Sequence, residues 1–175
     1  MSSVRPAELL FVGRPVPEKG LADLLAALSQ LRHLDWHLTV IGESPPDIDI
    51  MMLETAVTWL GCVTNREVAR IMSEQDVLIV PSHYETFGVV ALEGLASAML
   101  VIVSRTGGLK TLVQDRETGF HFRPGDVADL TRTLGYVIEN IGELTTIRFN
   151  ARAAALRYGW DEIVRQTAAL LARNA

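Results

Sequence analysis

Cysteine is nearly missing from this chain of 175 residues. Cys62 is the single cysteine, so no disulfide can form within the chain, and we expect a reducing, cytoplasmic setting. One cysteine and four scattered histidines also lack the spacing of a zinc-finger site, so the sequence predicts no bound metal. Lysine occurs only at Lys19 and Lys110, and a lysine in a loop after a strand is therefore a candidate for a specific role.

Long hydrophobic runs and a positive net charge are also lacking. No apolar stretch approaches the roughly 20 residues that a membrane-spanning helix needs, and the first ten residues contain no apolar segment of a signal peptide. The net charge of −5 argues against a nucleic-acid partner, which would favour a basic surface. It is compatible with a small anionic ligand, because a few cations and the N-termini of helices bind phosphate whatever the overall charge.

The chain does contain a regular alternation of short apolar runs and amphipathic helical stretches. The expected strands cover residues 9–13, 36–42, 57–60, 77–80, 100–103 and 118–122. The expected helices cover 19–32, 64–74 and 87–98, another opens at 107–108, and helical residues follow 126, with a new start at 160–161. Strands separated by helices indicate parallel pairing with right-handed crossovers. We therefore predict one α/β domain over residues 1–175, a Rossmann-like, doubly wound sheet of six parallel strands with helices on both faces and a C-terminal helical extension.

The loop after the fourth strand is the most informative of the predicted ligand-binding loops. In doubly wound folds, ligands bind beyond the carboxyl ends of the strands, near the point where the strand order reverses. Here these are the loops at 13–20, 42–47, 81–88 and 104–110. A helix is expected to begin near Phe87, which would leave the amides of Thr86, Phe87 and Gly88 free at its N-terminus, where an anion is favoured. Gly88 also allows a ligand to approach the backbone closely.

Glu93 falls in the middle of that otherwise apolar helix. No lysine or arginine lies three or four residues away to pair with it. Because burying an unpaired carboxylate is costly, we expect Glu93 to accept hydrogen bonds from a ligand, for which a pair of sugar or ribose hydroxyls is suitable. The alternative is a carboxylate that faces water. On its position alone, Glu85 is a solvated turn residue.

Glu85 and Glu93, separated by seven residues with Phe87-Gly88 between them, resemble the signature of the retaining group 1 (family 4) glycosyltransferases. The resemblance implies that Glu85 lies at the donor sugar and that Glu93 binds the ribose hydroxyls of a nucleotide. It also implies that the backbone after Glu85, from Thr86 to Val89, meets the sugar and the diphosphate.

The segment from Gly13 to Gly20 carries a second resemblance to this family. Gly13-Arg14 ends the first strand, and Lys19-Gly20 follows before a helix, as in the family's donor-binding domain. The resemblance implies that Arg14 and Lys19 neutralise the diphosphate. Fixed cations would stabilise the negative charge that the departing nucleotide gains when the glycosidic bond breaks. Without the resemblance, two cations in a loop are ordinary surface charge.

Further matches extend along the chain. They lie at Val40-Ile41-Gly42, Leu60-Gly61, Gly119 to Asp126 and Tyr158 to Asp161. The loop from Arg105 to Leu109 is more similar to the glycogen and starch synthase branch, and its Gly107 and Gly108 are candidate donor contacts. Lys110-Thr111 departs from the pattern, because the family often has a Pro-Glu pair there.

The resemblance implies the donor-binding, C-terminal half of a two-domain enzyme of the GT-B fold, whose N-terminal acceptor domain is supplied in cis or in trans. Such an enzyme transfers a hexose from a UDP-, GDP- or ADP-linked donor with retention and without an obligatory metal. A non-catalytic nucleotide-sugar-binding module and a subunit of a split enzyme remain alternatives, as does peripheral membrane association of the full enzyme. Apolar residues in the final helix, 160–173, are also expected to promote packing on the other half or self-association.

Overall fold

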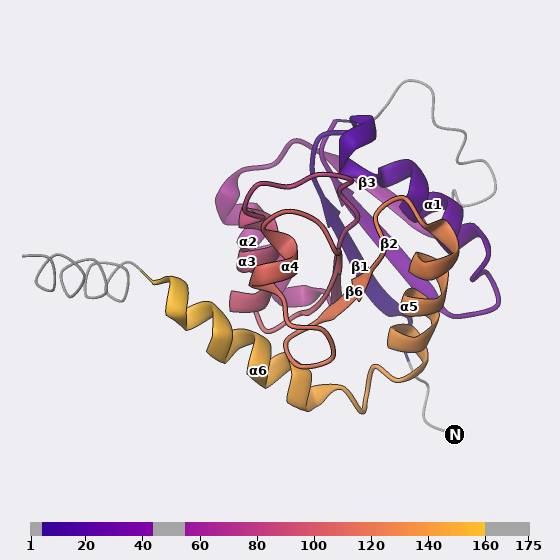
Figure 1. Cartoon of the computed structure of the whole chain (residues 1–175). Coiled ribbons are helices and arrows are strands. Elements are labelled where there is room, and N and C mark those ends of the chain that lie inside the picture. Colours follow the sequence, from indigo (N-terminus) through magenta and orange to yellow (C-terminus); the bar gives the residue numbers. More distant parts are fainter. Residues whose placement is uncertain (1–4, 44–54, 160–175) are drawn as a thin grey trace, which may run out of the picture.

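A single parallel sheet organises the computed structural model, which describes residues 5–43 and 55–159 (Figure 1). Its strands are β1 (Ala7–Val12), β2 (Trp36–Ile41), β3 (Val57–Gly61), β4 (Val77–Val80), β5 (Leu100–Ser104) and β6 (Phe120–Phe122). All pairings are parallel, in the order β3-β2-β1-β4-β5-β6. The prediction of six parallel strands is confirmed.

The strand order reverses between β1 and β4. From β1 the chain moves outward to β2 and β3, then returns to lay β4 on the other side of β1, where Leu9 pairs with Val77 and Leu10 with Leu78. In a doubly wound fold, the loops that leave two such strands at their carboxyl ends diverge and leave space for a ligand. The loops after β1 and β4 therefore flank the expected binding edge.

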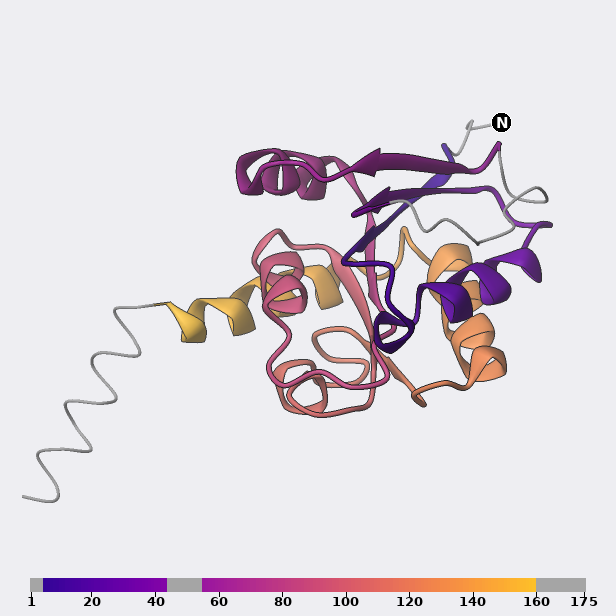
Figure 2. The same ribbon diagram turned by 90° about the horizontal axis from the view of Figure 1, so that it is seen from above.

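Helices cover both faces of the sheet, as predicted (Figures 1 and 2). On one face lie α1 (Leu21–Ser29) and α5 (Val127–Glu139), and on the other lie α2 (Asn65–Glu74), α3 (Val89–Ala96), α4 (Leu109–Leu112) and α6 (Thr145–Ala155). Short 3₁₀ helices span Pro17–Lys19 and Leu156–Tyr158. Side chains alternate along β1, so that Leu9 and Phe11 enter the core under α1 and α5 while Leu10 enters the opposite core. None of the helices described is long and apolar enough to cross a bilayer.

Local capping sets several helix boundaries. Thr64 and Glu67 form a reciprocal capping box at the start of α2, and the Asp126 carboxylate accepts a hydrogen bond from the Asp129 amide at the start of α5. The helix expected from Phe87 begins instead at Val89, because Gly88 is its N-cap with a left-handed φ of 94°.

The C-terminal helical extension consists of two helices rather than one continuous helix. A turn separates α5 from α6, in which the Glu143 amide donates to the Asn140 carbonyl oxygen at 2.8 Å. The final helix predicted over 160–173 lies outside the described ranges.

A buried carboxylate joins α6 to the amino-terminal edge of the sheet. Asp76, whose side chain is 12% exposed, accepts hydrogen bonds from Arg5 at 2.8 Å and from Arg148 of α6 at 3.3 Å. Its second oxygen accepts the Glu8 amide at 3.1 Å. A buried charge with two cations and a backbone donor is fully compensated, so this cluster has a structural role at the edge opposite to the expected ligand.

Candidate functional site

The loops that follow β1 and β4 are packed against each other at the switch point. The His83 amide donates to the Glu18 carbonyl oxygen at 2.8 Å. Gly20 has a φ of 69°, and a Cβ at this position would overlap the Pro81 carbonyl oxygen. Only glycine therefore allows the two backbones to lie this close.

This packing places Lys19 and Glu85 in direct contact. The Lys19 ammonium lies 2.7 Å from Glu85 Oε2, and the two side chains are 31% and 17% exposed. The sequence assigned both residues to one site through separate motifs, 66 positions apart. The structure brings them together, with a cation and a carboxylate facing each other across the switch point.

The loop after β5 contacts the backbone of Glu85. The Gly108 amide donates to the Glu85 carbonyl oxygen at 2.9 Å, and a Cβ on Gly107 would overlap that same oxygen. At the base of the loop, the buried Ser104 hydroxyl donates to the Ser82 carbonyl oxygen. Gly107 and Gly108 therefore lie at the predicted site, where they hold the backbone that carries Glu85.

The start of α3 corrects which amides face the site. Because Gly88 is the N-cap and the first helical bond runs from the Leu92 amide to the Gly88 carbonyl oxygen, the amides without a helical partner begin at Gly88. Thr86 and Phe87 precede the helix and have exposed side chains. Val89, at the first helical position, is 60% exposed. An apolar and amide-bearing surface therefore follows Glu85.

Glu93 is exposed, which corrects the expectation of a carboxylate enclosed by apolar side chains. It lies at a groove of about 480 Å³ between α2 and α3, and partial desolvation there raises the pKa of its carboxyl group above the ordinary value. The groove is lined by Val12, Asn65, Val68, Ala69, Met72, Val89, Val90, Glu93, Ala96 and Ser97. Glu93 follows Val89, the first residue of α3, by four residues, which is a rise of about 6 Å along the helix axis. A carboxylate thus borders a mostly apolar groove that begins at the end of β1.

Arg14 is also exposed, and no ion pair forms on it within residues 5–43 and 55–159. It follows Gly13, one residue beyond Val12, so it leaves the same strand end that lines the groove. No hydrogen bond joins Arg14 or Lys19 to Glu93 in the described part of the chain. The predicted phosphate-binding cations and the predicted ribose-binding acid therefore lie at one edge of the sheet without touching.

Sequence reasoning missed the partner of His83. Its Nε2 lies 2.6 Å from Asp23 Oδ2 on α1, so the ring and the backbone of His83 both attach the β4 loop to the β1 loop region. The signal was slight, because Asp23 and His83 are 60 positions apart. His83 is therefore a residue that holds the two loop regions together.

The sequence is similar to those of known proteins. Residues 2–154 match the model of the family "Glycosyl transferases group 1". Glycogen synthase of Mycobacterium tuberculosis (strain H37Rv) is 34% identical over 175 residues, covering 93% of this chain and 42% of the relative. The chain belongs to the group 1 glycosyl transferases.

Solved structures of this family agree in fold. Anabaena Alr3699/HepE, in complex with UDP and glucose, has a TM-score of 0.83 at 25% identity over 95% of this chain and 48% of that chain. The C-terminal domain of a group 1 glycosyl transferase (LpcC) of Francisella tularensis has a TM-score of 0.73 at 23% identity, over 87% of this chain and 86% of that domain. The resemblance to the C-terminal domain of a GT-B enzyme is confirmed, and the chain spans less than half the length of the full relatives named here.

Proposed function

We propose that this group 1 domain binds the nucleotide-sugar donor of an enzyme that transfers a hexose with retention. The observation that carries the proposal is the contact between Lys19 and Glu85 at the switch point, where β1, whose last residue Val12 lines the groove that Glu93 borders, also ends. A nucleoside diphosphate sugar has a base, a ribose, a charged diphosphate and a sugar in sequence. The groove, Glu93, the two cations and Glu85 provide a partner of suitable chemistry for each part.

Each residue then has a role that its position supports. The apolar groove takes the base, and Glu93 accepts hydrogen bonds from the ribose hydroxyls. Arg14 and Lys19 stabilise the diphosphate, whose negative charge grows as the bond to the sugar breaks. The Glu85 carboxylate lies at the sugar, with its backbone fixed by the Gly107-Gly108 loop. The side chains and amides from Thr86 to Val89 line the path between sugar and phosphates.

The relatives support a nucleotide donor and a hexose. Alr3699/HepE has been solved with UDP-glucose, and other similar proteins include D-inositol 3-phosphate glycosyltransferase of Xylanimonas cellulosilytica. The similarity to glycogen synthase agrees with the branch indicated by the loop from Arg105 to Leu109. We propose retention on the strength of the Glu85 and Glu93 motif, and we propose that a second domain supplies the acceptor.

Calorimetry tests donor binding. UDP, ADP and GDP, and the corresponding glucose nucleotides, are titrated into the chain, and one of them is expected to bind at a single site. Lys19→Met should weaken that binding by about tenfold to about a hundredfold, because a charge-assisted contact to phosphate is lost. Arg32→Gln, which removes an exposed cation of the α1–β2 connection, is the matched control. Absence of binding by every nucleotide, or equal weakening by both variants, contradicts the proposal.

A second experiment separates an active donor domain from a regulatory module. The chain is mixed with a separately produced acceptor-binding half, and transfer of labelled sugar is measured. Transfer with retention that Glu85→Gln abolishes supports the enzyme. Tight nucleotide-sugar binding without transfer in any such mixture favours the non-catalytic module.

A further inference from the structure

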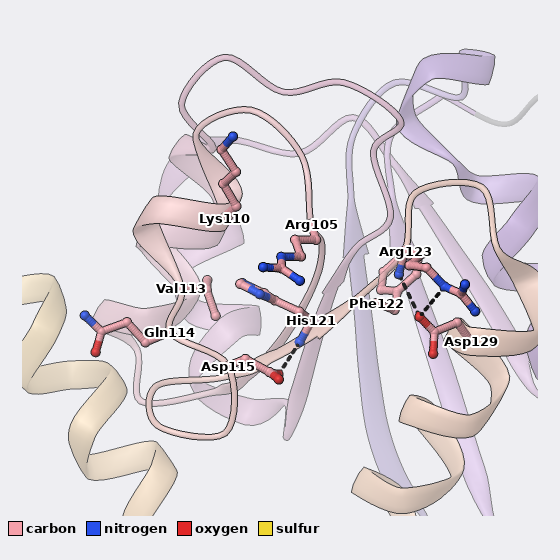
Figure 3. Close-up of a pocket in the computed structure, with 9 residues that line it drawn as sticks. All are labelled: Arg105, Lys110, Val113, Gln114, Asp115, His121, Phe122, Arg123 and Asp129. Atoms are coloured by element: carbon pink, nitrogen blue, oxygen red, sulfur yellow. Dashed lines mark hydrogen bonds and ion pairs between the residues drawn. The ribbon is translucent and has the colours of Figure 1, made fainter.

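We propose that a second pocket, at the carboxyl ends of β5 and β6, binds a sugar phosphate, with the phosphate between Arg105 and His121. This pocket, shown in Figure 3, has a volume of about 460 Å³ and shares no lining residue with the groove that Glu93 borders. Its lining residues are Arg105, Lys110, Val113, Gln114, Asp115, His121, Phe122, Arg123 and Asp129. It belongs neither to the loops after β1 and β4 nor to the α2–α3 groove.

The cations of this pocket are not equally available. Arg123 is held by Asp126 at 2.9 Å and by Asp129 at 3.6 Å. Arg105 and Lys110 form no ion pair within the residues that the structure describes. Figure 3 shows the guanidinium of Arg105 beside the ring of His121, with Lys110 at the rim. An anion that enters the pocket therefore meets an uncompensated guanidinium.

His121 supplies an independent sign of a missing partner. Its Nε2 is buried and has no hydrogen-bond partner among the described residues, while its backbone amide donates to Asp115 Oδ1 at 2.8 Å. A buried polar atom without a partner is costly in a folded protein, so each such atom calls for an explanation. A bound oxygen atom that accepts a hydrogen bond from the Nε2–H group would provide one.

The charge on the ring responds to such a ligand. Burial lowers the pKa of His121, Asp115 and a hydrogen bond with the Val113 backbone oppose the shift, and the nearby Arg105 adds to it. The other charged groups that line the pocket are Lys110, Arg123 and Asp129. A dianion placed between Arg105 and His121 favours the protonated ring, which then donates a charge-assisted hydrogen bond beside the guanidinium fork.

The remaining lining favours a phosphate ester of a hydroxylated molecule over inorganic phosphate alone. Gln114 and Asp115 provide an amide and a carboxylate that suit hydroxyl groups. Val113 and Phe122 provide an apolar surface, and protein sites for sugars combine such surfaces with a few polar groups. A sugar phosphate has both parts.

Binding of glucose 6-phosphate to the full chain tests the proposal. Calorimetry is expected to find one site, with affinity at least about tenfold higher than for inorganic phosphate and no binding of glucose at the same concentration. Arg105→Gln and His121→Gln should each weaken the affinity about tenfold or more, and Arg105→Lys should weaken it less than Arg105→Gln. Saturating UDP should not displace the ligand, and Lys19→Met should leave its affinity unchanged, which keeps this result independent of the proposed donor site.

Several results would overturn the inference. They are no measurable binding of glucose 6-phosphate, displacement by UDP, equal affinity for inorganic phosphate, and an equal loss in the exposed-surface control Arg32→Gln. Thermal unfolding of each variant, followed by circular dichroism, checks that the domain remains folded. Arg105 is exposed and His121 is only partly buried, so both variants are expected to retain the fold.

Discussion

The two edges of the sheet differ in how far the protein pairs its own charged groups, although Lys19 and Glu85 are paired at the carboxyl-terminal edge. At the amino-terminal edge, Asp76 is surrounded by Arg5, Arg148 and a backbone amide. At the carboxyl-terminal edge, Arg14 and Arg105 have no ion pair among the described residues, and Glu93 borders a groove. Charges that the protein itself compensates stabilise the fold, whereas charges left open at a cleft are available to a ligand.

The carboxyl-terminal edge also depends on close backbone packing. The loops after β1, β4 and β5 meet through Gly20 and Gly107, at positions where a side chain would overlap a neighbouring carbonyl oxygen. The amino-terminal edge is joined instead by long side chains. Substitutions at the amino-terminal edge should therefore mainly lower stability, whereas substitutions at the carboxyl-terminal edge should mainly weaken ligand binding.

The largest effect is expected from Asp76→Ala. The change removes the partner of the partly buried Arg148 and the acceptor of the Glu8 amide, and should lower the free energy of unfolding by about 3 kcal/mol. Urea denaturation measures the loss. Glu74→Ala breaks an exposed pair with Arg70 and should cost less than about 0.5 kcal/mol. UDP binding is then measured under conditions in which the Asp76→Ala protein is fully folded. Weaker binding than in the wild type would contradict the assignment of a purely structural role to this edge.

A smaller loss of stability, with a larger loss of binding, is expected from Gly107→Ala. The new Cβ would overlap the Glu85 carbonyl oxygen at a backbone φ of 43°, so the loop must shift, at a cost of about 2 kcal/mol. Glu85 would move with it, and UDP-glucose affinity should fall. Gly125→Ala, with a φ of 71° and open space around its Cβ, measures the conformational cost alone. Equal destabilisation in both variants would show that the overlap with the Glu85 carbonyl oxygen adds nothing to the conformational cost.

Much of this fold could be predicted from the sequence, because its elements are encoded locally. A few neighbouring residues suffice to predict some elements, such as the strand in the apolar run Val77–Val80 and the helix start capped by Thr64 and Glu67. The start of α3 was misplaced by two residues, since Gly88 has a left-handed φ and lies against Leu109 of α4, where a Cβ would overlap the leucine side chain. Local patterns do not contain such information.

The sequence proposes residues for the candidate site but does not show which of them touch. Lys19 and Glu85 came from separate motifs, and only the strand order that places β1 beside β4 makes them a pair. The pocket at Arg105 and His121 was missed for a related reason. Arg105 and His121 belong to two separate matching segments, 105–109 and 119–126, and only the pairing of β5 with β6 brings the two segments together in one pocket.

A pH dependence of stability is expected from His121. Its pKa in the folded protein lies below the ordinary value of 6.5, so between these two values the unfolded chain binds the additional proton. Stability should thus be fully present above about pH 6.5 and decline as the pH falls toward the folded pKa. His121→Gln should flatten this decline in urea denaturation at a series of pH values, whereas His33→Gln, at an exposed position, should not. Identical pH profiles for the wild type and His121→Gln would contradict the claim that partial burial lowers the pKa of His121.

The smallest effect on stability, and the sharpest contrast between the edges, is expected from Glu93→Gln. Desolvation raises the pKa of Glu93 in the folded state, so the charged form is destabilising above the folded pKa, and that cost disappears as the pH falls below 4.5. At neutral pH the neutral amide should therefore stabilise the fold slightly, in the direction opposite to Asp76→Ala. The same change should weaken UDP binding, because an amide is a poorer acceptor than a carboxylate for two ribose hydroxyls. Gain of stability together with loss of binding is the behaviour of a residue placed for a ligand.

A Glu93→Gln protein that binds UDP as tightly as the wild type would contradict a role of Glu93 in nucleotide binding. Glu139→Gln, at an exposed position on α5, is the control for the removal of one negative charge.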